Sequence, residues 1–259
     1  MNPVRVARGA SREQPVFAPL ATRYAPRNLD MPLITLDNVS KSYRHGSLQV
    51  PALTGFSLSV EAGEFTVLAG PSGSGKTTVL NLVGGLDRPT AGTVTVGSLE
   101  VGAAPAAVLA DYRLRRVGFI FQSYNLIPVL TAAENAEFTL MLQGVPRPER
   151  RRRVLELFAE LGIDGLEERR PGDLSGGQQQ RVAIARALAA EPDVVLADEP
   201  TANLDSHTAE ELLDLMRGLN HRRGVTFLFS SHDDRVIGRA RRVVRLEDGR
   251  LVSDIAPEP

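Results

Sequence analysis

The sequence of 259 residues contains no cysteine, which excludes disulfide bonds, thiolate metal sites and cysteine nucleophiles and fits a reducing cytosol. No stretch approaches the roughly 20 apolar residues of a membrane-spanning helix, and no apolar segment is typical of a signal peptide. An excess of either charge is also missing, since the formal net charge is -1. A nucleic-acid partner therefore has no global electrostatic support, and we expect the chain to reach a membrane only through a partner.

The chain contains enough apolar residues to build a sizeable hydrophobic core. Hydrophobic residues make up 42% of the chain, and the length suits one α/β domain or a domain with a smaller insert. Residues 1–31 are rich in Arg, Ala and Pro and show no helical or strand period, so we predict a disordered tail. A targeting peptide and a misassigned start, with Met31 as the true initiator, are the alternatives. We expect a folded domain over residues 32–254 and a short tail at 255–259.

A glycine-rich loop at residues 70–78 is the feature around which the other motifs are arranged. It follows the apolar run Phe65–Ala69, typical of a buried parallel strand, and precedes Val79–Val83, which can continue as a helix. Strand, G-x-x-x-x-G-K-T loop and helix are the context of a phosphate-binding loop, whose backbone N–H groups face an anion. Lys76 would reach the terminal phosphates, and Thr77 would ligate magnesium. The predicted loop residues are Gly70, Pro71, Ser72, Gly73, Ser74, Gly75, Lys76, Thr77 and Thr78.

Polar side chains follow three further apolar runs that are predicted to be parallel strands. Gln122 follows the run at 117–121, Asp198 and Glu199 end the run at 194–199, and His232 follows the run at 226–230. Because ligand groups gather at the carboxyl edge of such a sheet, we expect these side chains near the phosphate loop. Asp198 would hold hydrated magnesium, and Glu199 would polarise a water molecule. Taken alone, Gln122 is more typical of an ordinary turn, and a turn role is also the alternative for His232.

Three runs outside the parallel set predict an antiparallel edge sheet: Leu33–Val39, Phe56–Val60 and Thr93–Val96. Tyr43 lies between the first two of them. Its ring would stack on a nucleotide base, or it would be a half-buried surface tyrosine, and its position favours neither.

Helical sequence occupies the middle of the chain. We predict a helical section from Thr131 to about Leu161, with a charged break at Arg147–Arg153 that forms a solvated helix face. A second helix is predicted to begin at Ser175, a good N-cap residue. The glycine pair at 176 and 177 would leave N–H groups bare for an anion, or would simply begin a capped helix.

Taken together, these residues resemble the ATP-binding cassette family, the nucleotide-binding subunits of ABC transporters. The resemblance covers about residues 33–252, and its most specific element is Leu174–Gln178, which resembles the family's LSGGQ motif. The other motifs stand in the family's order: the A-loop tyrosine (Tyr43), the Walker A loop (Gly70–Thr78), the Q-loop (Gln122), Walker B (Asp198), the catalytic glutamate (Glu199), the D-loop (Ala202–Asp205) and the switch histidine (His232).

The sequence around the motifs is similar to one branch of that family, the lipoprotein-release and macrolide-export ATPases. The similar segments are Asn81–Asp87, Phe119–Gln122 and Ala132–Asn135. Two positions depart from the branch: Ala202 stands where glycine is frequent, and Ser231 stands where threonine is common. Neither departure removes a reacting group.

The resemblance implies a fold and a mechanism. The fold would be α/β, a P-loop NTPase ABC-cassette fold with a mostly parallel core sheet, an antiparallel β subdomain and a helical subdomain at about residues 123–190. Two copies, as a homodimer or pseudo-dimer, would close head to tail around two ATP molecules. Each ATP would lie on one copy's phosphate loop and under the partner copy's motif, formed by Ser175, Gly176, Gly177 and Gln178.

The resemblance also implies residue roles. Glu199 would act as the base, His232 would contact the γ-phosphate, and Gln122 would join them in catalysis. Thr77, Gln122 and Asp198 would hold Mg²⁺, and Asp205 would contribute to nucleotide binding. Closure would pull on a separate transmembrane permease through the surface near Gln122, including the apolar segment at 124–130. The protein would then lie in the cytoplasm, peripheral on the inner face of the plasma membrane, with no nucleic-acid partner.

Two other functions compete with transport. A regulator of cell-wall hydrolases that works through a similar membrane protein would carry the same motifs. A DNA- or ribosome-associated ATPase of the family is disfavoured, because such relatives usually carry a long coiled coil or two cassettes in tandem. The transported substrate and the direction of transport do not follow from the motifs.

We predict that the N-terminal segment is dispensable, because it is proline-rich and aperiodic. A chain that begins at Met31 is expected to melt at the same temperature and to hydrolyse ATP at the same rate as the full chain. A lower melting temperature or a large loss of activity would contradict this.

Overall fold

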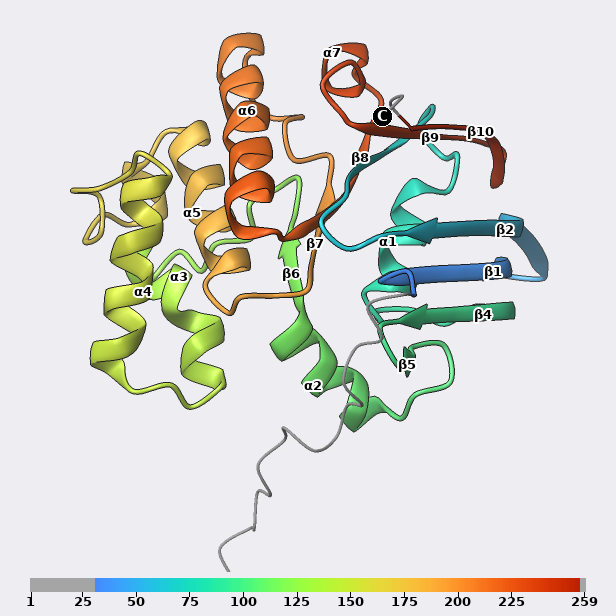
Figure 1. Cartoon of the computed structure of the whole chain (residues 1–259), viewed down its shortest axis with the longest axis horizontal. Coiled ribbons are helices and arrows are strands. Elements are labelled where there is room, and N and C mark those ends of the chain that lie inside the picture. Colours follow the sequence, from blue (N-terminus) through green and yellow to red (C-terminus); the bar gives the residue numbers. More distant parts are fainter. Residues whose placement is uncertain (1–30, 257–259) are drawn as a thin grey trace, which may run out of the picture.

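The structure is a computed structural model that describes residues 31–256 (Figure 1). The predicted tail lies outside these residues except for Met31, and only residues 255 and 256 of the predicted C-terminal tail are described. The domain boundaries proposed above therefore stay predictions.

The centre of the molecule is a six-stranded sheet with the order β10-β9-β3-β8-β7-β6. Its strands are β3 (Phe65–Ala69), β6 (Val117–Ile120), β7 (Val194–Asp198), β8 (Thr226–Ser231), β9 (Arg242–Glu247) and β10 (Arg250–Ile255). All neighbouring pairs are parallel except β9 and β10. The strands β3 and β8 are buried along their whole length, as expected of parallel strands covered on both faces.

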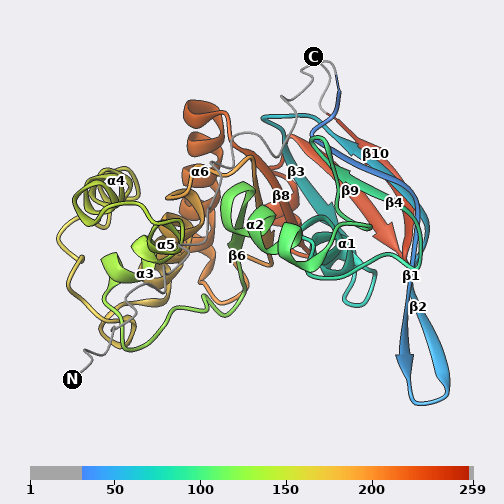
Figure 2. The ribbon, with the colours of Figure 1, turned by 90° about the horizontal axis from the view of Figure 1, so that it is seen from below.

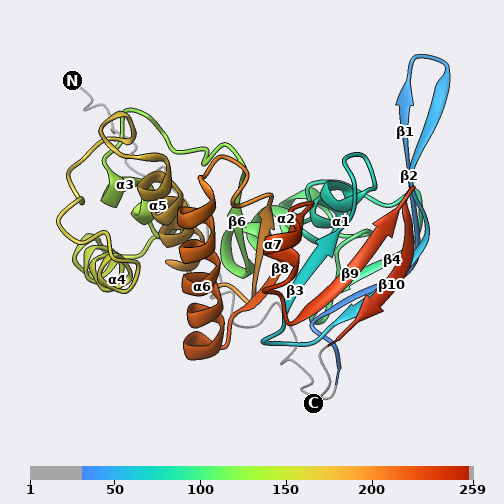
Figure 3. The same ribbon diagram turned by 90° about the horizontal axis from the view of Figure 1, so that it is seen from above.

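A four-stranded antiparallel sheet with the order β2-β1-β4-β5 lies beside the central sheet. Its strands are β1 (Ile34–His45), β2 (Leu48–Val60), β4 (Ala91–Val96) and β5 (Leu99–Glu100). Figures 2 and 3 show that the tip of the β1–β2 hairpin projects away from the rest of the molecule. The end of β2 alternates strictly between buried and exposed residues from Phe56 to Val60, as the sequence pattern predicted.

Two apolar cores hold the sheets and helices together. The helices are α1 (Lys76–Val83), α2 (Ala106–Arg116), α3 (Ala132–Leu142), α4 (Arg147–Glu160), α5 (Gly176–Leu188), α6 (Ser206–Arg223) and α7 (Asp234–Ile237). Successive residues of β8 face opposite cores, because strand side chains alternate. Phe227 and Phe229 lie in the core with α3, α4, α5 and α6, whereas Leu228 lies in the core with α1 and the antiparallel sheet.

This architecture confirms the predicted fold class, and all seven predicted strand regions are strands. One boundary was wrong: the charged segment at 147–153 is not a break but the first half of α4. The break lies just before it, because Gly144 adopts a left-handed φ of 79° and Pro146 caps the next helix. Within α4, Arg152 forms ion pairs one turn away with Glu149 and Glu156.

Gly118 sets how closely α5 packs on the sheet. A Cβ added at this buried position of β6 would lie 2.5 Å from the carbonyl oxygen of Ala187, so β6 and α5 touch through backbone atoms. Only a residue without a side chain allows this approach.

We predict that Gly118→Ala lowers the free energy of unfolding by about 1–3 kcal/mol, because the added methyl group forces α5 away from β6. Urea denaturation measures the loss. Gly172→Ala is the control, since a Cβ there would meet no atom within 4 Å. Equal stability of the two variants would contradict the packing argument.

Candidate functional site

The start of α1 has the features of an anion site. Gly75 precedes the helix in a left-handed conformation with φ 103°, makes no side-chain cap, and is followed by no acidic residue in the first turn. By contrast, Thr131 caps α3 and Asp205 caps α6 through side-chain oxygens. The first N–H groups of α1 therefore face the loop without a side-chain acceptor, beside the positive end of the helix dipole.

Lys76 lies inside the curl of this loop. Its ammonium donates to the carbonyl oxygens of Gly70 at 2.7 Å and Pro71 at 2.8 Å. An ammonium group has three donors, so one remains for a ligand. Burial lowers the pKa of Lys76, while the nearby carboxylates of Glu199 and Asp198 act in the opposite direction.

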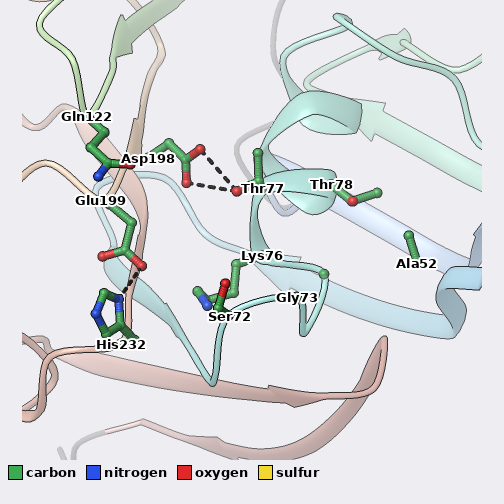
Figure 4. Close-up of a pocket in the computed structure, with 11 residues that line it drawn as sticks. Ala52, Ser72, Gly73, Lys76, Thr77, Thr78, Gln122, Asp198, Glu199 and His232 are labelled. Carbon is green, nitrogen blue, oxygen red and sulfur yellow. Dashed lines mark hydrogen bonds and ion pairs between the residues drawn. The ribbon is translucent and has the colours of Figure 1, made fainter. Parts of the chain in front are cut away.

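A cavity of about 400 Å³ opens above the loop (Figure 4). It is lined by Ala52, Ser72, Gly73, Gly75, Lys76, Thr77, Thr78, Gln122, Asp198, Glu199 and His232. The structure thus brings together six of the nine predicted loop residues with the predicted groups at the ends of β6, β7 and β8, whereas Gly70, Pro71 and Ser74 do not line the cavity. A volume of this size is within the range of small-molecule sites.

Asp198 faces the loop at the end of β7. Its two carboxylate oxygens lie 3.1 and 3.0 Å from the Thr77 hydroxyl, and one of them accepts a hydrogen bond of 2.6 Å from the Ser230 hydroxyl. A carboxylate and a hydroxyl oxygen therefore converge on the same side of the cavity.

Glu199 points away from Asp198 and toward His232 (Figure 4). Its carboxylate lies 2.8 Å from His232 Nδ1. Glu199 has a left-handed φ of 47°, so a turn of the backbone, rather than the side-chain alternation of an extended strand, separates the two acids. The Ser230 hydroxyl accepts a hydrogen bond of 2.9 Å from the Glu199 N–H and so supports the turn.

The segment that begins at Gln122 is held by side chains from two other parts of the chain, Asn203 and Arg186. Its carbonyl oxygen accepts a hydrogen bond of 2.8 Å from the Asn203 side chain of the predicted D-loop. The next turn contains two left-handed residues, Tyr124 with φ 59° and Asn125 with φ 50°. The guanidinium of Arg186 on α5 donates to the carbonyl oxygens of both. Burial lowers the pKa of Arg186.

The remainder of this segment is only partly exposed. Leu126 packs against the core of α3 and α5, whereas Val129 is 74% exposed. The buried side chain of Asn135 accepts a hydrogen bond from Ile127 N–H and donates to the carbonyl oxygens of Ile127, Leu130 and Thr131. The predicted contact surface at 124–130 is therefore a folded loop with few free apolar groups.

Tyr43 does not line the cavity. Its hydroxyl donates to Asp87 at 2.9 Å. Burial raises the pKa of Tyr43, a hydrogen bond with Thr78 lowers it, and the Asp87 contact raises it further. Since Thr78 lines the cavity, the tyrosine ring stands at the rim on that side.

The predicted motif at 175–178 also lies outside the cavity, at the start of α5. Ser175 and Gln178 form a reciprocal capping box, so these two side chains are engaged within the helix. A Cβ at Gly176 would lie 2.8 Å from the Tyr124 hydroxyl, and one at Gly177 would lie 2.7 Å from Thr208. Packing inside one chain thus already favours glycine at both positions.

Asp205 is occupied at the start of α6. Its carboxylate accepts hydrogen bonds from the N–H groups of His207 and Thr208 and from the Thr208 hydroxyl. These hydrogen bonds, the Thr208 hydroxyl first, lower the pKa of Asp205.

Two contributors to the site were not predicted from the sequence. Ser230 was predicted only as the end of a strand, although it contacts both Asp198 and Glu199. The β9–β10 turn was not predicted either, although Gly249 donates to the carbonyl oxygen of Ser74 in the loop. The Asp248-Gly249 pair between two apolar runs is a hairpin signal that would have found this turn.

Within residues 31–256, none of the helices combines the length and the apolar character needed to span a bilayer. In the same residues, no group of three or more His, Asp or Glu side chains would hold a metal ion by itself.

The family model and two similar curated proteins all point to the same family. The family described as "ABC transporter" matches residues 53–202. The lipoprotein-releasing system ATP-binding protein LolD of Anaeromyxobacter dehalogenans is 49% identical over 224 residues, which cover 86% of this chain and 94% of that protein. The macrolide export ATP-binding/permease protein MacB of Hyphomonas neptunium is 45% identical over 223 residues, which cover 86% of this chain but 34% of that protein.

A solved structure agrees with these sequence relatives. The post-hydrolysis dimer of the ATP-binding cassette MJ0796 bound to ADP and Pi has a TM-score of 0.80 and 40% sequence identity. The alignment covers 87% of this chain and 99% of that one. The likeness thus extends over nearly all of the described residues.

Proposed function

This chain belongs to the ABC transporter family and is an ATP-binding, ATP-hydrolysing subunit of the lipoprotein-release and macrolide-export type, and we propose how its residues perform that task. The observation that carries the proposal is the cavity above the phosphate loop. Lys76 at the start of α1, Asp198 and Glu199 at the end of β7, and His232 after β8 converge there.

We assign the chemistry to the residues as follows. The uncapped N–H groups of α1 and the free donor of Lys76 bind the ATP phosphates. Glu199 takes a proton from the attacking water as general base. Its contact of 2.8 Å with His232 Nδ1 orients the carboxylate within the cavity. Gln122, exposed at the cavity wall, would contact the same water or the metal.

Magnesium fits the same site. Thr77 and Asp198 present hydroxyl and carboxylate oxygens that face each other, and Gln122 adds an amide oxygen at the cavity wall. Mg²⁺ prefers such oxygen ligands, and in many nucleotide-binding sites it is held by one carboxylate together with the phosphates of the substrate. When bound, Mg²⁺ would neutralise charge on the phosphate oxygens. The residues proposed to hold it are Thr77, Gln122 and Asp198.

A second copy of the chain completes the proposed site. The start of α5 is not part of the cavity wall, although the resemblance assigns Ser175–Gln178 to ATP. A head-to-tail dimer would place that helix start over the partner's ATP, and the cassette MJ0796 is described as dimeric with ADP and Pi. The proposal therefore has two ATP molecules between two copies.

We further propose that a separate membrane permease docks in a groove between α3 and β6. The groove has a volume of about 390 Å³ and is lined by Leu86, Arg113, Leu114, Val117, Gly118, Phe119, Phe121, Asn125, Phe138, Thr139, Leu142, Arg186 and Ala187. Its wall thus contains apolar groups and two arginines, with no carboxylate. An amphipathic segment with an acidic side chain is complementary to such a surface. The protein would then act in the cytoplasm, on the inner face of the membrane.

The proposed chemistry is tested by Glu199→Gln. This change keeps the size and hydrogen-bonding capacity of the side chain but removes the base, so the turnover number is expected to fall by about 10²–10⁴-fold. Binding of ATP with Mg²⁺ is expected to survive, because the loop and Lys76 are unchanged. The variant would accumulate as a closed dimer, seen as an earlier elution in size-exclusion chromatography.

Asp198→Asn is the comparison, since it is expected to weaken Mg²⁺-dependent ATP binding and turnover together. Hydrolysis by Glu199→Gln at the parental rate would show that the carboxylate is not the base.

Docking in the groove is tested by Leu142→Asp. Leu142 is 57% exposed at the groove, and a charge there is expected to lower recovery of the membrane subunit with the tagged chain at least about tenfold. Val252→Asp is a matched control, since Val252 is 58% exposed but lies on β10. Equal recovery with both variants, at unchanged melting temperatures, would place the docking surface elsewhere.

A further inference from the structure

Lys41, Tyr43 and Asp87 form a closed set of contacts between the second half of β1 and the segment that follows α1. Asp87 follows α1, and its two carboxylate oxygens are shared between two partners. One accepts a hydrogen bond of 2.6 Å from the Lys41 ammonium, and the other accepts one of 2.9 Å from the Tyr43 hydroxyl. The Lys41 ammonium also lies over the Tyr43 ring, 4.9 Å from its centroid. Each of the three groups therefore contacts the other two.

The set is anchored on the side of α1. The Lys41 ammonium donates to the carbonyl oxygen of Arg88 at 2.8 Å, and the Arg88 N–H donates to Asp87 at 2.7 Å. The Lys41 side chain is only 12% exposed. Burial alone would raise the pKa of Asp87, but the hydrogen bonds from Lys41, the Arg88 N–H and Tyr43 outweigh it and lower the pKa. The carboxylate is thus charged at neutral pH and keeps both partners.

These contacts restrict the orientation of the tyrosine ring. Its hydroxyl end is held by Asp87 and lies at Thr78, which lines the cavity. One ring face is occupied by the Lys41 ammonium, an arrangement attractive for a cation and an aromatic ring. The residue is still 40% exposed. The other face is therefore the surface that the ring can offer to a ligand at the rim of the cavity.

We propose that Lys41 and Asp87 are positioning residues for nucleotide binding, which hold the Tyr43 ring so that its other face stacks on the base of ATP. The inference rests on the proposed function, in which ATP phosphates lie on the loop beside Thr78. Stacking on a ring that is already held loses less side-chain entropy than stacking on a free one. Lys41 and Asp87 act through Tyr43 and do not touch the nucleotide.

A purely structural tie between β1 and the end of α1 is the competing explanation. Such a tie would affect the phosphate loop and the base site alike, because α1 carries the loop's Lys76 and Thr77. Positioning of the ring affects only ligands that have a base. Inorganic tripolyphosphate, which has the phosphates without a base, separates the two explanations.

The test measures the Kd of ATP and of tripolyphosphate with Mg²⁺, using the full chain in the Glu199→Gln background so that ATP is not consumed. Tyr43→Ala is expected to weaken ATP binding by about 5- to 150-fold. Lys41→Met, which keeps the aliphatic stem, and Asp87→Asn are expected to weaken it by about 3- to 10-fold. The Kd of tripolyphosphate is expected to stay within twofold in all three variants.

Two further comparisons isolate the action through Tyr43. In the Tyr43→Ala background, Lys41→Met is expected to change the Kd of ATP by less than twofold, since the ring it positions is gone. Lys41→Arg is expected to restore ATP affinity, because a guanidinium can both pair with Asp87 and lie over the ring. Arg44→Met removes a cation from the exposed opposite face of the same strand and is expected to have no effect.

Equal weakening of ATP and tripolyphosphate binding by Lys41→Met would identify a structural tie and overturn the inference, with the proposed function intact. A loss from Lys41→Met that persists in the Tyr43→Ala background would overturn it as well. An unchanged Kd of ATP in Tyr43→Ala would remove the ring from the base site and the inference with it. Failure of the parent chain to hydrolyse ATP would instead contradict the proposed function.

Discussion

The close packing around the backbone of the phosphate loop, which leaves no space for side chains at Gly70 and Gly75, is the constraint on which the rest of the structure depends. A Cβ at Gly70 would lie 2.2 Å from the carbonyl oxygen of Leu246, and one at Gly75 would lie 2.7 Å from that of Ala52. The loop is thus clamped between β9 and β2, which belong to different sheets. Gly249 strengthens the clamp, since its N–H donates to Ser74 and its carbonyl oxygen accepts from Thr54. The two sheets meet at the loop, and their junction fixes its shape.

The elements that were predictable from the sequence are those with a local pattern. Buried parallel strands appear as short apolar runs, and the polar groups that end them, such as Asp198, stand out against that background. The glycine-rich loop was predictable because its spacing and its strand and helix neighbours agree. The helix break before Arg147 was misplaced because a run of charge was weighted above Gly144 and Pro146, the residues that stop and start helices.

The details that were not predictable depend on residues far apart in the chain. Ser230 contacts Asp198 across 32 positions, and Tyr43 contacts Asp87 across 44. Neither pair leaves a periodic signal, because each is created when separate strands or helices come together. The left-handed conformation of Glu199 is similar: an acid after a buried strand predicts a polar edge, but not the backbone turn that aims it at His232.

The hydrogen bonds from Arg186 to the turn after Gln122 couple any movement of α5 to that turn. The guanidinium is held by two carbonyl oxygens of left-handed residues, and no ion pair with a carboxylate is formed by it in the described part of the chain. Because Ser175 caps α5 and Arg186 lies about two turns beyond Gln178 on the same helix, tilting this helix must either break those bonds or displace Tyr124 and Asn125. The turn also leads directly from the cavity wall at Gln122 to the groove wall at Asn125. Arg186 therefore connects the helix that begins with the motif to a turn that borders both the ATP cavity and the groove, so a shift at any one of these three places reaches the other two.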